Sequence, residues 1–274
     1  MANFTNRIAL AAACLAAITA LPAQTLKPEA LSAYACYLQS AETRMAARTA
    51  FLVTDANPAQ KDSLVRGKNV LTTPGNGSNP QKAPGALIYD WVGTIFIPGA
   101  TVQRTVRMLQ DYDHRASYFP EVIASSKLFC RTGETRFGFT MRLKEPVVAD
   151  VDNDVIWERL DDRRWRCRSY SGEVREIGKP KGYVHRLTSY WRFLETAEGV
   201  FVEGQAITLG GEFGAFMRTL GSLVGSSPEK SLRKTLNSMR ETLGSTREFA
   251  PPPAGVPACG QLPSATGCTL QSNR

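Results

Sequence analysis

The sequence predicts an α+β fold, in which seven antiparallel strands form one curved sheet and a long C-terminal helix lies across its concave side. Three observations predict it. Strand-like runs follow one another from 122 to 209 without helices between them, which requires antiparallel pairing through hairpins. An earlier strand is followed by two short helices, and a strongly marked helix begins at Pro228.

Turn residues separate the expected strands. The first strand covers 86–97 and stops at Pro98-Gly99. The others are expected near 122–132, 135–145, 151–160, 163–177, 183–195 and 199–209. The short helices are expected over 100–110 and 113–119. In the closing helix Ser227 is the expected N-cap, and one apolar face carries Leu232, Leu236, Met239 and Leu243.

A further helix is expected before the sheet domain, over 28–53. Its apolar stripe consists of Leu31, Leu38, Met45 and Leu52, with Tyr34 and Ala41 between them. This stripe favours a brace packed on the domain, and a coiled-coil partner helix is the alternative. We therefore divide the chain into a helical extension (24–71), a linker rich in Pro and Gly (72–85), the sheet domain (86–248) and a Pro-rich tail (249–274).

The first 23 residues have the composition of a signal peptide. Arg7 gives a basic start, Ile8–Leu21 is an Ala-rich apolar run, and cleavage is expected after Ala23 or else after Ala20. We therefore expect an exported protein, either periplasmic or secreted. A loose lipobox ending at Cys14 is the alternative, although Leu is missing three residues upstream.

Cleavage leaves five cysteines, and export permits disulfides. Cys259 and Cys268 lie close together in the tail, which favours a local pair. Cys130 and Cys167 lie on expected strands and either pair or remain buried thiols, while Cys36 is unassigned. No C-x-x-C occurs, so neither a redox dithiol nor a zinc knuckle is indicated.

The composition allows a full core and excludes several chemistries. The chain is 43% hydrophobic and 21% charged, and its net charge of +8 is spread in mixed-sign neighbourhoods, so nucleic acid is not an expected partner. Only two histidines occur, and G-x-S-x-G and G-x-G-x-x-G are absent. Asp150–Asp154 lacks the glycine and the final glutamate of a calcium loop. We therefore expect no cofactor and no metal.

Three segments carry a family resemblance. They are Leu109–Val122 around the short helices, Ser189–Glu203 in the last hairpin, and Ser227–Leu232 at the start of the closing helix. With the element order, they resemble the START-like superfamily of lipid-transfer domains and polyketide cyclases, and residues 28–247 look like a group of exported bacterial proteins with such a domain. The resemblance implies a helix-grip fold with an apolar cavity between sheet and helix, and it implies no catalytic residue.

The parity of the strands predicts which side chains line that cavity. Phe137, Phe139, Met141 and Leu143 share one face, opposite Arg136, Thr140 and Arg142. On two later strands the inward sets are Trp165, Cys167, Ser169 and Ser171, and Tyr183, His185, Leu187, Ser189, Trp191 and Phe193. The outward faces are expected to be wet. Because several inward residues are small or polar, they favour a ligand cavity with orienting groups, and an ordinary core in which they bond one another is the alternative.

The face of Glu203 depends on the turn at Thr196–Gly199. A bulged turn puts Glu203 inward near His185, as a polar anchor or an acid–base pair, whereas a slip of one residue sends it to solvent. Residues 210–225 combine apolar positions at helical spacing with five glycines. They are either a lid or membrane-touching portal, or a buried connector.

These observations predict an exported protein that binds or transfers a lipid-like or other hydrophobic small molecule. The alternatives are a cyclase or dehydratase that uses His185 and Glu203, and a non-catalytic interaction protein with a filled core. The oligomeric state does not follow from the sequence. The expected ligand-binding residues are Phe139, Met141, Trp157, Arg159, Trp165, Ser169, His185, Ser189, Trp191, Glu203, Leu236 and Met239.

Overall fold

One antiparallel sheet of nine strands runs through the described part of the computed structural model, which comprises residues 26–74, 78–130, 136–144, 148–178, 184–211 and 228–245. The strands are β1 (Val70–Thr72), β2 (Gln81–Ala83), β3 (Ala86–Pro98), β4 (Val122–Cys130), β5 (Arg136–Leu143), β6 (Ala149–Arg159), β7 (Arg164–Glu176), β8 (Val184–Thr196) and β9 (Gly199–Gly211). Their order is β1-β3-β9-β8-β7-β6-β5-β4, and β2 also pairs with β3.

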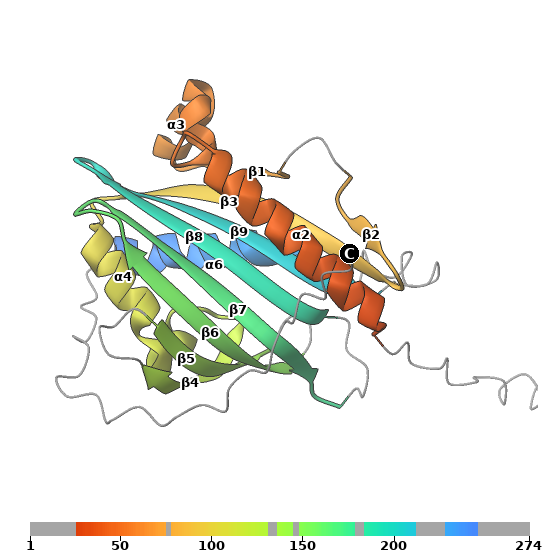
Figure 1. Ribbon diagram of the computed structural model, residues 1–274. Coiled ribbons are helices and arrows are strands. Elements are labelled where there is room, and N and C mark those ends of the chain that lie inside the picture. Colours follow the sequence, from red (N-terminus) through yellow and green to blue (C-terminus); the bar gives the residue numbers. More distant parts are fainter. Residues whose placement is uncertain are drawn as a thin grey trace, which may run out of the picture.

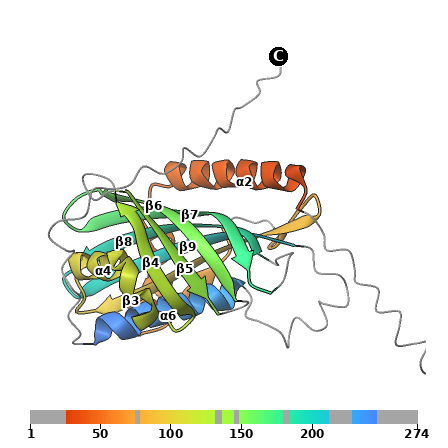
Figure 2. The same cartoon turned by 90° about the horizontal axis from the view of Figure 1, so that it is seen from below.

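Helices lie on both faces of this sheet, as Figure 2 shows. The helices are α2 (Pro28–Ala47), α3 (Pro58–Val65), α4 (Val102–Gln110) and α6 (Pro228–Gly244), with the 3₁₀ helices η1 (Val53–Ala56) and η2 (Tyr112–Ser117). In Figure 1, α2 crosses the outer face of the sheet, while α6 lies on the opposite, concave face. The predicted α+β helix-grip architecture is confirmed.

All seven expected strands are present, as β3 to β9. From β4 to β9, each strand pairs antiparallel with the next strand in the sequence. The tightest turn joins β8 to β9, where Thr196 pairs with Gly199 and only Ala197 and Glu198 intervene. Gly199 has φ of +152°, and a Cβ there would lie 2.2 Å from the carbonyl oxygen of Ile97. Glycine is therefore required at this position.

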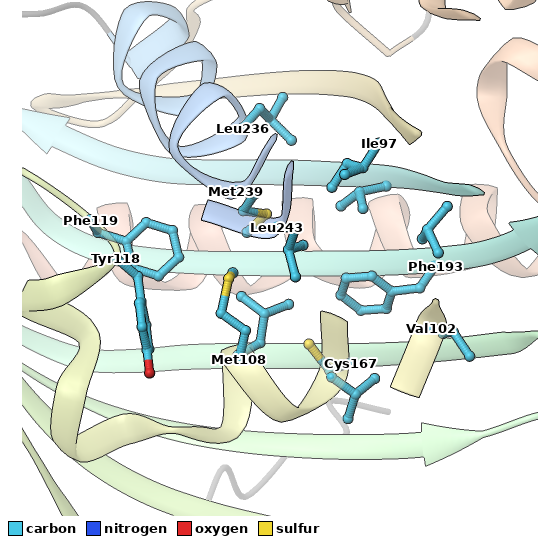
Figure 3. Packing of buried hydrophobic residues seen from close by; sticks show 14 of the residues in the cluster. Ile97, Val102, Met108, Tyr118, Phe119, Cys167, Phe193, Leu236, Met239 and Leu243 are labelled. Carbon is cyan, nitrogen blue, oxygen red and sulfur yellow. The ribbon is translucent and has the colours of Figure 1, made fainter. Parts of the chain in front are cut away.

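The main core lies between the concave face and α6 (Figure 3). Leu236, Met239 and Leu243 of α6 are buried against β3, β8, β9 and the short helix α4. A Cβ placed at Gly93 would lie 2.6 Å from a methyl group of Leu236, so the missing side chain lets the helix approach β3 closely.

The outer face of β3 and β9 is buried and that of β8 is half-buried, rather than wet, which corrects the expectation from strand parity. Tyr34 and Ala41 of α2 pack there against Ile88, Ile207 and Leu209, as a brace. The helix ends at Ala47, earlier than predicted, because Arg48 adopts an extended conformation. Beyond it, Leu52 is buried in a separate cluster with Leu64, Phe96 and Phe201.

Two short strands lie at the ends of the expected linker. Val70–Thr72 (β1) pairs with β3 along Val92–Thr94, and Gln81–Ala83 (β2) pairs with Ala86–Ile88. Gly85, with φ of +73°, lies in the turn that joins β2 to β3. The segment therefore extends the sheet at its β3 side instead of running free.

Candidate functional site

Small side chains meet in the middle of the concave face. The pairing registers place Ala206 beside Ser189, Ser189 beside Ser169, and Ser171 beside Asn153. Thr208 follows Ala206 on the same side of β9, with Leu187 between it and Ser171. We call this set the small-residue band: it comprises Asn153, Ser169, Ser171, Ser189, Ala206 and Thr208.

Aromatic side chains border the band on three sides. Trp91 pairs with Ala206 at the β3 edge, and Phe139 pairs with Asn153 at the β5 edge. Trp191 of β8 lies flat over Gly204, since a Cβ there would come within 2.4 Å of its ring. The band is therefore a shallow area of sheet between large apolar rings.

Burial differs sharply between the two halves of the concave face. Ile95, Phe193 and Val202 are fully buried where α6 covers the sheet. In the other half Trp91, Met141, Ser169, Ser189, Trp191 and Ala206 are half-buried, whereas Asn153, Ser171 and Thr208 of the band are buried. The half that carries the band, which we call the open half, therefore offers accessible apolar surface.

Hydrogen bonds within the band satisfy part of its polar groups. Ser171 Oγ donates to Asn153 Oδ1 at 2.7 Å, and Ser169 Oγ lies 3.4 Å from the same oxygen. Trp191 Nε1 donates to Ser189 Oγ at 3.0 Å. The Ser189 hydroxyl accepts this bond and keeps its own proton available to donate. The band therefore supplies polar groups for orientation within a mostly apolar surface.

Sequence reasoning missed Arg115, which projects into the same core from η2. Its guanidinium carbon lies 4.8 Å from the ring centre of Phe139, 5.3 Å from that of Phe119 and 5.4 Å from that of Tyr112. Burial lowers the pKa of Arg115. The spacing of Tyr112, Arg115 and Phe119 at three and four residues was a usable signal, because such positions share one helical face.

Nine of the twelve predicted site residues share the concave side. They are Phe139, Met141, Trp157, Trp165, Ser169, Ser189, Trp191, Leu236 and Met239. Four of them, Phe139, Trp157, Leu236 and Met239, are buried in the packed core. Trp157 stacks on Phe193 with 5.7 Å between ring centres, and its Nε1 donates to the Tyr112 hydroxyl at 2.8 Å.

The predicted pairing of His185 with Glu203 is wrong. Arg186, the neighbour of His185, lies opposite Leu209, whereas Glu203 lies opposite Arg192. Six residues of β8 separate these positions, which corresponds to about 20 Å along the strand. The two-residue turn also places Glu203 on the outer face, where it is 4% exposed under the N-terminal segment and not in solvent.

Arg159 also lies away from the band. It is exposed at the end of β6, and its Nε donates to the carbonyl oxygen of Asp161 at 3.4 Å. His185 is the extra residue of a bulge in β8, and burial lowers the pKa of its imidazole. Neither residue joins the cluster that the sequence suggested.

Other sequence features have structural explanations. Asp150, Asp152 and Asp154 lie on β6 and form ion pairs with Arg142, Arg175 and Arg136. Within the described ranges no group of three His, Cys, Asp or Glu side chains has a metal-binding arrangement. No helix of these ranges is long and apolar enough to cross a membrane.

Two cysteines of the described part are free thiols. Cys36 is exposed on α2 and Cys167 is buried on β7. The Cys130 side chain, Cys259 and Cys268 lie outside the described residues, as do Cys14, Tyr183 and Ser227. Of the expected lid over 210–225, only the first two residues are described, and they end β9.

No protein-family model and no curated protein matches this chain. Among solved structures, a STAR-related lipid transfer protein fragment from Xanthomonas axonopodis is 20% identical, with a TM-score of 0.45 over 61% of this chain and 98% of that one. The Zhui aromatase/cyclase from Streptomyces is 11% identical, with a TM-score of 0.44 over 57% and 93%. The lipid transfer and protein localization domain of human StarD13 is 10% identical, with a TM-score of 0.42 over 71% and 98%.

The fold is the predicted helix-grip fold. A strand, two short helices, six antiparallel strands and a long helix across the concave face follow one another in the predicted order. The sheet differs from the expected plan by the additional strands β1 and β2, whereas the predicted brace is present as α2.

Proposed function

We propose that this protein binds a hydrophobic small molecule, lipid-like in character, on the open half of its concave sheet face. The observation that carries the proposal is the small-residue band bordered by half-buried tryptophans. Small side chains leave room above a sheet, and accessible rings gain free energy when a ligand covers them. We also propose that the protein is exported, on the strength of its first 23 residues.

The energetic scale of such binding follows from area. Removing apolar surface from water contributes about 25 cal/mol per Å², so covering roughly 300 Å² contributes about 7 kcal/mol before the costs of association. Hydroxyls such as that of Ser189 add orientation at little cost, because each already has a partner. Affinity is therefore expected to increase with the apolar area of the ligand.

A cyclase-type enzyme that uses His185 and Glu203 as an acid–base pair is contradicted by the geometry. The acid–base version required His185 and Glu203 in one pocket, and the registers separate them along the sheet. A protein with a completely filled core is supported for the half under α6, where Phe193 and Leu236 are fully buried. A carrier and a filled scaffold therefore differ in whether a ligand binds on the open half.

A large side chain placed in the small-residue band tests the proposal. We expect Ser169→Phe to weaken binding of a fluorescent acyl probe at least tenfold, because the ring occupies the space beside Ser189 and Asn153. Tyr170→Trp is the matched control, since Tyr170 is the next residue on β7 and its side chain is 42% exposed on the outer face. Probe titration followed by Trp fluorescence measures both variants.

Two outcomes would count against the proposal. The first is a wild-type protein that binds none of a panel of fatty acids, phospholipids and sterols and that purifies without a bound molecule in native mass spectrometry. The second is equal affinity of wild type and Ser169→Phe. Either result leaves the domain as a scaffold.

A further inference from the structure

The interior of the sheet domain contains a positive charge whose place in the core is not explained by an ion pair. Arg115 extends from η2 over the rings of Tyr112, Phe119 and Phe139. Phe139 belongs to the main core and borders the small-residue band through its pairing with Asn153. The guanidinium therefore lies at the β5 edge of the proposed binding surface.

The hydrogen-bonding capacity of Arg115 is largely unused. Nη2 donates to the carbonyl oxygen of Leu109 at 3.3 Å, which is a long bond. Nε is buried and has no hydrogen-bond partner. An arginine side chain carries five N–H donors, so most of its donors remain available in the described structure.

No carboxylate of the described ranges lies within 4.0 Å of Arg115, although other arginines there, such as Arg136 and Arg142, form ion pairs. Two acids lie near Arg115 beyond ion-pair distance. Asp111 accepts from Tyr118 and contacts His114, whereas one oxygen of Glu121 accepts from Thr235 at 3.1 Å and its other oxygen is buried without a hydrogen-bond partner. The charge of Arg115 is therefore offset by these two carboxylates from a distance and, at closer range, by the faces of three aromatic rings.

A partly buried cation without a partner is costly, and ring faces offset only part of that cost. An anion that enters the same space gains charge-assisted hydrogen bonds in a medium of low dielectric constant. Cys167 of the concave face is close enough for the charge of Arg115 to act on its thiol, whose pKa is raised by burial. Because the guanidinium lies over the ring of Phe139, which belongs to the concave face, the positive charge also faces the inner surface of the sheet.

We propose that Arg115 binds the anionic head of the ligand, so that the ligand class is an anionic amphiphile with a carboxylate or phosphate head. This inference rests on the proposed function. The tail would follow the small-residue band from Phe139 to Trp91, across five strand spacings of about 4.8 Å, or roughly 24 Å. A long acyl chain fits that path.

The experiment compares ligands that differ only in the head. Binding of palmitate, hexadecanol and monohexadecyl phosphate is measured by isothermal titration with wild type, Arg115→Met and Arg142→Met. Methionine keeps an unbranched apolar stem against the rings and removes the charge. Arg142 is the control for net charge, because it is exposed on β5 and paired with Asp150.

We expect wild type and Arg142→Met to bind palmitate or the phosphate at least tenfold more tightly than hexadecanol. We expect Arg115→Met to bind all three alike, with its hexadecanol affinity unchanged. The anion that binds more tightly to wild type shows whether the preferred head group is a carboxylate or a phosphate. If wild type binds hexadecanol as tightly as both anions, the proposed role of Arg115 is wrong and the proposed function stands. If Arg115→Met lowers the affinity for all three ligands equally, Arg115 is structural and its proposed role is again wrong.

A wild-type protein that binds none of the three ligands contradicts the proposed function itself. If Arg115→Met fails to fold, the comparison of heads in wild type still decides the question, and Arg115→Lys provides a charged variant. Lysine keeps the charge without the planar fork, so it should retain a preference for the anions that is weaker than that of wild type.

Discussion

Trp191 shows how one missing side chain sets the shape of the open half. Its indole lies over Gly204, the residue opposite it on β9, and its Nε1 is fixed by Ser189. Any larger residue at 204 would meet the ring at 2.4 Å, where a rigid aromatic group cannot yield without turning about its side-chain bonds. Glycine here keeps Trp191 flat and leaves room above the band.

We therefore expect Gly204→Ala to displace Trp191, to destabilise the protein by about 1–3 kcal/mol, and to alter Trp fluorescence. Gly172→Ala on β7 is the control, because a Cβ there meets nothing closer than 3.7 Å. Urea unfolding and the emission maximum measure both effects. Identical curves for the two variants would show that Trp191 does not depend on the absence of a side chain at Gly204.

At the scale of elements, α2 is held on the sheet by polar contacts as well as by its apolar stripe. Tyr34 donates its hydroxyl to the carbonyl oxygen of Ile207 at 2.8 Å. At the end of the helix Arg48 pairs with Glu203 at 2.7 Å, and the backbone N–H of Val53 donates to the other oxygen of that carboxylate at 2.5 Å. The carboxylate that sequence reasoning assigned to the ligand thus secures the N-terminal segment.

Removing this carboxylate should loosen the segment. We expect Glu203→Ala to cost about 2–3 kcal/mol, because Arg48 and the Val53 N–H lose their acceptor in a buried place. Hydrogen exchange should increase along 28–56 more than in β5 or β6. Glu198→Ala, in the exposed turn before β9, should change stability by less than about 0.5 kcal/mol. Unchanged exchange in α2 would contradict this role.

The elements that the sequence predicted well are those with strong local signals. Alternation, turn residues and helix caps act over a few neighbours, so the strands and α6 were found nearly to their ends. The face of Glu203 depended on the length of one turn, and a shift of one residue reverses a whole strand. Burial of the outer face depended on α2: its apolar stripe predicted a brace, but no local pattern shows which face of the sheet the brace covers.

At the scale of the whole molecule, stability depends on a carboxyl buried between α2 and the sheet. Asp90 of β3 is 3% exposed, accepts from Gln205 at 2.8 Å and from the Tyr37 hydroxyl at 2.9 Å, and lies 3.9 Å from Arg44. Burial raises the pKa of Asp90, although the hydrogen bonds from Gln205 and Tyr37 oppose that shift. Burial and Asp90 together raise the pKa of Tyr37 to about 12, so Tyr37 remains a donor.

The sign of the pH effect follows from this direction. Because the folded carboxyl has a higher pKa than the unfolded one, the native state binds more protons in the interval between the two values. The contribution of the Asp90 carboxyl to stability is therefore greatest in acid. It is lost as the pH rises from the ordinary pKa of 3.8 through the raised pKa of the folded protein. Asp90→Asn cannot ionise at this position. Its free energy of unfolding in urea should therefore increase relative to that of wild type as the pH increases from 4 towards 8.

Asp150 is the opposite case and serves as the control for this pH series. Hydrogen bonds from Arg142 lower its pKa, so its contribution is present above 3.8 and is lost only in stronger acid. Asp150→Asn should therefore be less stable than wild type by a nearly constant amount from pH 4 to 8, and should show no gain over this rise in pH. If Asp90→Asn instead weakens the protein increasingly as the pH rises, the ionised carboxylate of Asp90 stabilises α2 on the sheet, and burial is not the dominant influence on it.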